Sequence, residues 1–311
     1  MAGSRRYLAC HSDPERREGE ESLPSPRSLA NSANGGPYAA WLRQELSARN
    51  QSYAAAHGLP ARFSLGEPPV VCYGPAEDGR SHGNFYPASY RAIQGNPSWQ
   101  RRFRKVHTSA GTAFVSYEGE GMRELDSCNS SDALLMNILC CPRVCDDARM
   151  SGMLGIEAGA DPEFGWRARV PFAGGGADAT EVDMRLGDLL VEAKLTEGDF
   201  QITRDPAQVE RYRDFADVFE QRRLPRARRQ YLSYQLIRNV LAAHVHGCSF
   251  CVLLDERRPD LREAWFAVLA AVRPLELRLR CKVLSWQELA GTAPARLRAF
   301  LKEKYGIAAN L

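Results

Sequence analysis

Residues 180–196, TEVDMRLGDLLVEAKLT, have the pattern of two short strands joined by a tight turn. Gly187 and Asp188 suit the central positions of a two-residue β-hairpin loop. A turn at this dipeptide fixes the register of the two strands, and in that register Asp183 faces Glu192. The segment therefore predicts a β-hairpin that carries two directly opposed carboxylates.

The two faces of this hairpin differ in polarity, because successive side chains of a strand point to opposite faces. The first face is charged and carries Glu181, Asp183, Glu192 and Lys194. The second face is apolar and carries Val182, Met184, Leu186, Leu189, Val191, Ala193 and Leu195. The apolar face predicts packing against a core. The charged face is the candidate functional surface, and a surface hairpin whose charges are merely solvated is the alternative.

The opposed carboxylates need a compensating charge, because like charges that face each other across two strands destabilise a sheet. A hard divalent cation such as Mg²⁺ takes carboxylate oxygens as ligands and would supply that charge. Lys194 lies on the same face, just beyond Glu192. Its ammonium group would orient or deprotonate an attacking water, or neutralise charge that develops on a phosphate.

An Asp, a short gap and Glu-x-Lys across a hairpin resemble the signature of the PD-(D/E)xK nuclease superfamily. This resemblance implies that Asp183, Glu192 and the carbonyl of Ala193 hold Mg²⁺, with Mn²⁺ as an alternative ion. It also implies that Lys194 assists the attack of water on a phosphodiester. No proline precedes Asp183, and the superfamily keeps that position only loosely.

Residues 129–144, NSSDALLMNILCCPRV, predict a helix with an apolar stripe that ends at Pro142. The helix precedes the hairpin, where the superfamily places its first core helix. The run SSDALLMNIL also resembles the Ser-Ser-x-x-apolar-x-Asn-apolar helix of a restriction-endonuclease-like family within the superfamily.

Two further site residues follow from the same resemblance. The superfamily often supplies another acidic residue from its first helix or first strand, and Glu163 is predicted for this role ahead of Glu157, because it precedes the strand-like residues 167–172. The helix after the lysine strand often presents a polar residue, frequently Gln, to the site. Gln235, beside the apolar stripe of a predicted helix over 231–246, fits that position. Loop carboxylates and a solvent-facing Gln are the alternatives.

The order of elements predicts an α/β fold with a mixed sheet. A strand at 249–254, a helix at 261–272, a strand at 277–284 and a helix at 294–305 follow the hairpin and its helix. This order resembles the restriction-endonuclease-like α-β-β-β-α-β core, with helices on both faces and an appended βα extension. The predicted divisions are a disordered segment over 1–36, a helical and loop extension over 37–124, and a nuclease-like domain over 125–311.

Two arginine-rich segments are candidates for contact with phosphate groups. In the first, Arg101, Arg102, Arg104 and Lys105 flank Phe103. The second, RRLPRARRQ, spans residues 222–230. For both segments the alternative is a solvated surface. Since the formal net charge of the whole chain is only +3, attraction to nucleic acid would depend on such local clusters.

The cysteines and the hydropathy indicate where the protein works. The nine cysteines are an odd number, and no secretory signal precedes them, which favours reduced thiols in a cytoplasm. Cys248 and Cys251 have the spacing C-x-x-C, for which a bound metal or cluster is an alternative to burial in the core. No apolar run approaches the ~18 residues that a membrane helix requires.

These observations lead to one main hypothesis and two alternatives. The first is a Mg²⁺-dependent DNA endonuclease of the restriction type, with double-stranded DNA as substrate and a homodimer as the simplest means of cutting both strands. The second is a non-catalytic nucleic-acid-binding or regulatory module on the same fold. The third is a structural protein in which the hairpin is coincidental.

Overall fold

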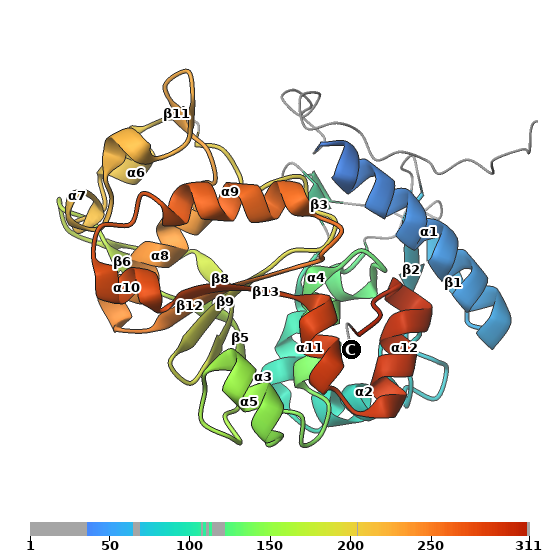
Figure 1. Ribbon diagram of the computed structural model, residues 1–311. Helices are drawn as coiled ribbons and strands as arrows, with labels where there is room; N and C mark the ends of the chain where they lie inside the picture. The colour runs from blue at the N-terminus through green and yellow to red at the C-terminus, as the bar shows by residue number, and fades with distance from the viewer. Residues whose placement is uncertain are drawn as a thin grey trace, which may run out of the picture.

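The computed structural model describes residues 36–64, 69–106, 108–109, 112–113, 122–203 and 205–309. The predicted disordered segment lies outside the described residues except for Gly36. A five-stranded mixed sheet forms the centre of the fold (Figure 1). Its strands are β5 (Pro162–Arg167), β8 (Glu181–Leu186), β9 (Leu189–Ala193), β12 (Ser249–Leu254) and β13 (Cys281–Ser285).

The strand order is β13-β12-β9-β8-β5. β5, β8 and β9 form an antiparallel meander, and β12 and β13 add to β9 in parallel. Parallel neighbours require a crossover connection, and helices supply both crossovers. β9 is therefore the central strand, with every residue buried.

Helices surround the sheet, and short strands lie outside it. The helices are α1 (Pro37–His57), α2 (Pro87–Gln94), α3 (Pro97–Gln100), η2 (Arg101–Arg104), η3 (Glu124–Asp126), α4 (Ser131–Leu139), α5 (Ala148–Leu154), α6 (Ala207–Glu210), α7 (Phe215–Val218), η4 (Gln221–Arg223), α8 (Tyr234–His246), α9 (Pro259–Leu269), α10 (Leu275–Leu279), α11 (Trp286–Thr292) and α12 (Ala295–Tyr305). The short strands are β1 (Ala61–Phe63), β2 (Val71–Tyr73), β3 (Thr108–Ser109), β4 (Thr112–Ala113), β6 (Val170–Pro171), β7 (Ala177–Asp178), β10 (Arg226–Ala227) and β11 (Gln230–Tyr231).

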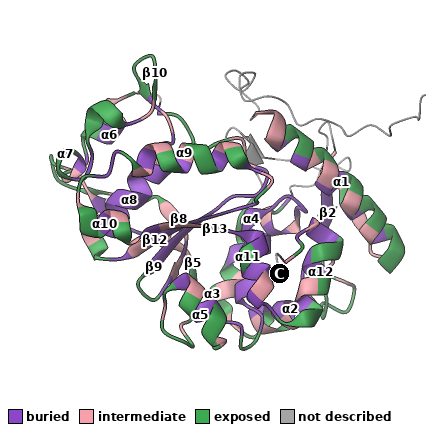
Figure 2. Cartoon of the chain, viewed as in Figure 1, coloured by how far each residue is buried: buried purple, intermediate pink, exposed green. Residues whose placement is uncertain are grey.

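The sheet separates two apolar cores. Side chains of α6 to α10 pack on one face, around Trp265 and Leu190. Side chains of α1, α4, α5, α11 and α12 pack on the other, around Trp286 and Val191. The central strands β9 and β12 are buried and the outer sides of the helices are exposed (Figure 2). The protein is thus a mixed α/β fold with helices on both faces of the sheet, as the order of elements predicts.

The predicted hairpin is confirmed. Leu186 pairs with Leu189, and Met184 pairs with Val191, in the expected register. Gly187 has a φ of 58°, in the left-handed region that its turn position requires. The predicted strand at 249–254 coincides with β12.

Three elements differ from their prediction. The strand predicted at 167–172 is wrong as a single strand: β5 ends at Arg167 and the separate β6 covers Val170–Pro171, so Glu163 lies inside β5 and not before a strand. β5 is an edge strand, which tolerates its Pro162 and a Gly165 with a φ of 66°, and both residues resemble turn signals in the sequence. The strand predicted at 277–284 is divided between α10 and β13, and α11 was not predicted. These helices are short, so their period is weak in the sequence.

The structure also bears on the predictions about the thiols and about membrane helices. Every described cysteine is free and buried. Cys248 packs in the α8 core and Cys251 in the core on the opposite face of the sheet, so alternation along β12 separates them. Among the described residues, no helix is both long enough and apolar enough to cross a membrane.

Lys304, near the end of α12, is fully buried where α12 packs on α1. Its Nζ donates a hydrogen bond to Asn50 Oδ1 at 2.8 Å and lies 3.7 Å from the centre of the Tyr73 ring. Burial lowers the pKa of Lys304 from 10.5 to about 7. The folded protein therefore holds a neutral amine at a pH where the unfolded chain is protonated.

We expect Lys304→Met to be more stable than the wild-type protein at pH 7. The unfolded chain binds a proton at Lys304 below pH 10.5, whereas the folded protein does so only below about 7. Wild-type stability should therefore rise with pH across this window, relative to the variant, by up to about 1.4 kcal/mol per pH unit. Urea unfolding at pH 7, 8, 9 and 10 measures the difference. Lys302→Met, at an exposed position of α12, is the control, and a pH-independent advantage of Lys304→Met would contradict the assignment.

Candidate active site

A buried ion pair lies at the end of the central strand. Glu192 belongs to β9, and Lys194 follows its last residue. The two residues are 1 % and 5 % exposed, and Lys194 Nζ lies 2.7 Å from Glu192 Oε1. The second carboxylate oxygen accepts a hydrogen bond from Asn239 Nδ2 at 2.6 Å. α8 thus supplies a partner for Glu192 from above the sheet.

Asp183 lies on the neighbouring strand, but not in the predicted direct pair with Glu192. The ladder of backbone pairs between β8 and β9 ends at Met184 and Val191, one residue before Asp183 and Glu192. Asp183 Oδ2 instead accepts a hydrogen bond from the backbone N–H of Ala193 at 2.8 Å. This contact satisfies one carboxylate oxygen of Asp183, although the negative charge of Glu192 still acts on it.

Asp183 lies close to other negative charges. Burial, the charge of Glu192 and the charge of Asp132 raise the pKa of Asp183 from 3.8 to about 8, and Lys194 only partly offsets them. The side chain nevertheless keeps some exposure to solvent. In the absence of a cation, the carboxyl group is therefore largely neutral near pH 7.

Lys194 keeps its charge despite its burial. Burial alone would lower its pKa, but the carboxylates of Glu192, Glu197 and Asp183 together raise it. The ammonium group also lies 5.7 Å from the centre of the Phe200 ring. Lys194 is thus a fixed cation, suited to stabilising negative charge and not to accepting a proton.

The backbone around Lys194 is held by buried donors. Trp286 Nε1 donates to the carbonyl of Lys194 at 2.9 Å. Arg258, which is fully buried, donates to the carbonyls of Leu195 at 3.2 Å and Glu197 at 2.7 Å. The Glu197 carboxylate in turn accepts from the N–H of Leu195 at 2.6 Å. These hydrogen bonds fix the backbone of residues 194–197, directly after β9.

A third carboxylate reaches this site from α4. Asp132 is buried, and its charge acts on Asp183. Its Oδ2 accepts from Arg102 Nη2 at 2.8 Å and from Lys105 Nζ at 2.9 Å. Arg102 also binds Glu181 through Nη1 at 2.8 Å. Two cations from the segment around η2 therefore balance the acidic residues on this side of the site.

The remaining predicted residues occupy different surroundings. Gln235 lies one turn before Asn239 on α8, on the same side of the helix, and its Oε1 is buried without a hydrogen-bond partner among the described residues. Glu163 is exposed on β5, opposite Arg185. The structure brings Asp183, Glu192 and Lys194 together and places Gln235 on the helix that faces them, whereas Glu163 lies nearer the hairpin turn.

Asp132 and Asn239 are candidate site residues that the sequence prediction missed. A signal for each was present. Asp132 lies within the SSDALLMNIL helix, and the superfamily often takes an acid from its first helix. Asn239 follows Gln235 by four residues, which is the spacing of neighbours on one helical face.

The arrangement offers ligands for a hard cation. Asp183 and Glu192, with the carbonyl of Ala193, could hold such an ion through oxygen atoms. In the described part of the chain, no three His, Cys, Asp or Glu side chains converge as a ready-made metal cage. An ion held here would therefore depend on backbone oxygen, water or substrate for its other ligands.

We expect Asp183→Asn to stabilise the metal-free protein at pH 8. The folded protein retains a proton on Asp183 up to about pH 8, whereas the unfolded chain loses it near 3.8. Wild-type stability should therefore fall, relative to the variant, as pH rises from 4 to 8, by up to about 1.4 kcal/mol per pH unit. Urea unfolding in the presence of a chelator measures this. Asp188→Asn, at the exposed hairpin turn, is the control and should show no such slope.

The chain matches a known protein family. Residues 43–306 match a protein family described as restriction endonuclease associating with ARP. The matched region includes all five strands of the sheet and the helices on both faces, from within α1 to the end of α12. Searches of curated proteins and of solved structures found no match.

Proposed function

This chain belongs to the restriction endonuclease family that its residues 43–306 match, and from that premise we propose that it hydrolyses phosphodiester bonds of double-stranded DNA with the help of Mg²⁺. The observation that carries the proposal is the buried Glu192–Lys194 pair beside Asp183. The order α4, β5, β8, β9, α8, β12 supports it, because the α-β-β-β-α-β core of the PD-(D/E)xK superfamily has the same order.

The residues present fit a divalent cation. Burial and the charges of Glu192 and Asp132 make the ionised form of Asp183 costly, and a cation bound beside it would remove that cost. Asp183, Glu192 and the Ala193 carbonyl would hold Mg²⁺, with Mn²⁺ as an alternative. A cation held by these residues would supply Lewis-acid chemistry, by polarising the scissile phosphate and lowering the pKa of a water.

Lys194 would act by electrostatic stabilisation. Its ammonium is held at 2.7 Å from Glu192, so it is in place before substrate arrives. A preorganised cation of this kind stabilises the negative charge that develops on a phosphate during hydrolysis. Because neighbouring carboxylates raise its pKa, Lys194 would orient the attacking water and not deprotonate it.

Asp132 and Gln235 would complete the site. Asp132 supplies a third carboxylate from α4, and we propose it in place of Glu163, which is exposed on the edge strand. Gln235 would donate or accept a hydrogen bond with the attacking water or a phosphate oxygen, because its buried Oε1 has no partner among the described residues.

Lys194→Gln should lower the rate of Mg²⁺-dependent plasmid cleavage by at least ~100-fold, which is the scale of losing one preorganised electrostatic contact. Gln can still donate a hydrogen bond to Glu192, which reduces the destabilisation expected when one partner of a buried ion pair is removed. Nicking and linearisation of plasmid measure the rate, and circular dichroism measures the fold.

Wild-type activity in this variant would refute the role of Lys194. Mg²⁺-dependent cleavage that survives in Asp183→Ala would point to a contaminating nuclease. No cleavage by the wild-type protein would favour the non-catalytic module.

Asp132→Asn and Glu163→Gln decide which acid is the third carboxylate. We expect Asp132→Asn to reduce cleavage more than tenfold and to weaken Mn²⁺ binding, because its charge acts directly on Asp183. Glu163→Gln should change neither, because its side chain is exposed on β5. Cleavage assays and calorimetric titration with Mn²⁺ provide the two measurements. The opposite ranking would restore Glu163 as the third acid.

A further inference from the structure

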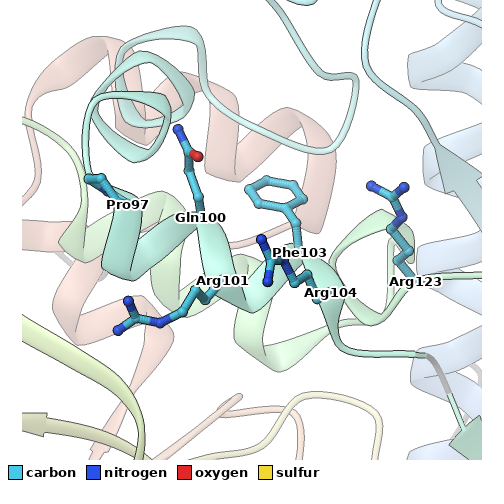
Figure 3. A pocket seen from close by; sticks show the side chains of 6 residues that line it. All are labelled: Pro97, Gln100, Arg101, Phe103, Arg104 and Arg123. Atoms are coloured by element: carbon cyan, nitrogen blue, oxygen red, sulfur yellow. The ribbon is translucent and has the colours of Figure 1, made fainter.

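Three exposed arginines lie around one hollow of the surface, next to the candidate active site. Arg101 and Arg104 belong to η2, and Arg123 lies on the segment beside it (Figure 3). Pro97, Gln100 and Phe103 complete the lining of the hollow. We call Arg101, Arg104 and Arg123 the arginine surface.

Among the described residues, the arginines of the arginine surface differ from their neighbours in having no carboxylate as an ion-pair partner. Within the described residues, none of the three arginines forms an ion pair with a carboxylate. Arg102 and Lys105, in the same segment, both bind Asp132. The segment thus directs two cations inward to the acidic site and keeps two outward, where they can meet an anionic ligand.

The residues beneath the arginine surface pack against the rest of the fold. The Phe103 ring packs at 5.3 Å from the ring of Phe85 and 5.8 Å from that of His82, measured between centroids. Trp99 Nε1 donates to the carbonyl of Pro162 at 2.8 Å, which ties the preceding α3 to β5. The N–H of Glu124, next to Arg123, donates to the carbonyl of Lys105 at 2.9 Å. Binding therefore does not require the backbone here to become ordered first.

The arginine surface is adjacent along the chain to Arg102, which contacts the candidate active site. Arg102 is flanked by Arg101 in the sequence and binds Asp132 and Glu181. Asp132 acts electrostatically on Asp183. A polyanion bound at the arginine surface would therefore run close to the proposed metal ligands.

We propose that the arginine surface binds phosphate groups of the DNA backbone beside the bond that is cut. Guanidinium groups bind phosphate oxygens through paired N–H donors, and such contacts fix the position of a duplex without reading its sequence. With a formal net charge of only +3, the protein depends on such local clusters for its attraction to DNA. The choice of DNA rests on the proposed function, but binding is measured without cleavage.

The test compares the full chain with the triple variant Arg101→Ala, Arg104→Ala, Arg123→Ala. Fluorescence anisotropy gives the affinity for a 24-base-pair DNA duplex across a salt series, with a chelator present so that no cleavage occurs. Each lost phosphate contact lowers the slope of log affinity against log salt by about 0.9. We expect the slope to become shallower by about 2 to 3, and the affinity at 0.15 M salt to fall ~100-fold. The loss should be equal for two duplexes of unrelated sequence, because backbone contacts carry no sequence information.

Two further variants separate this role from a loss of charge or of folding. The triple variant Arg143→Ala, Arg149→Ala, Arg296→Ala removes the same charge from exposed positions elsewhere, and it should keep the wild-type slope. Replacing the arginine surface with three lysines should also keep it, because lysine retains the point charge. An unchanged slope in the variant Arg101→Ala, Arg104→Ala, Arg123→Ala would contradict phosphate binding at the arginine surface. An equal loss of slope in the control variant would contradict it too. Either result leaves the nuclease proposal intact. Absence of cleavage by the wild-type protein, with the expected slopes, contradicts the nuclease proposal alone.

Discussion

The burial of the Glu192–Lys194 ion pair is the constraint on which the rest of the site depends. Removing two charges from water costs several kcal/mol per ion, and their attraction offsets this only when the geometry is good and the remaining polar atoms have partners. Here Asn239 satisfies the second oxygen of Glu192, and Trp286 and Arg258 hold the backbone next to Lys194. A buried pair is weak evidence for stability, so a function is the better reason for its presence.

The surrounding elements are arranged to hold this pair in place. β9 is the central strand, and both neighbours and both helical layers exclude water from it. α8 brings Asn239 and Gln235 to one side, whereas α4 brings Asp132 to another. Arg258 reaches the site from the start of α9. Residues that are distant in the sequence therefore converge only because the sheet fixes the positions of their helices.

The sequence predicts those features that depend on neighbouring residues. The register of β8 and β9 follows from one turn dipeptide, Gly187-Asp188, and from strict alternation, and it is confirmed. The resemblance to a restriction-endonuclease-like family is confirmed by the family match. The sequence could not single out Asp132 and Asn239 among other polar residues, because their roles arise from contacts between residues that are distant in the sequence. Arg102, which binds both Asp132 and Glu181, is indistinguishable in the sequence from the exposed Arg101 and Arg104.

The balance of charge around the site explains where a cation would bind. Arg102 and Lys105 compensate Asp132 and Glu181, and Lys194 compensates Glu192. Asp183 receives one backbone N–H, and its burial together with the charges of Glu192 and Asp132 raises its pKa to about 8. Glu192 is more deeply buried than Asp183. If Lys194 were paired with Asp183 instead, the unpaired negative charge would lie on Glu192, where burial would raise its free-energy cost. Because Lys194 pairs with Glu192, the one of these two carboxyl groups without a cationic partner among the described residues is that of Asp183. Asp183 is the more accessible of the two, so a cation with bound water would reach it more easily.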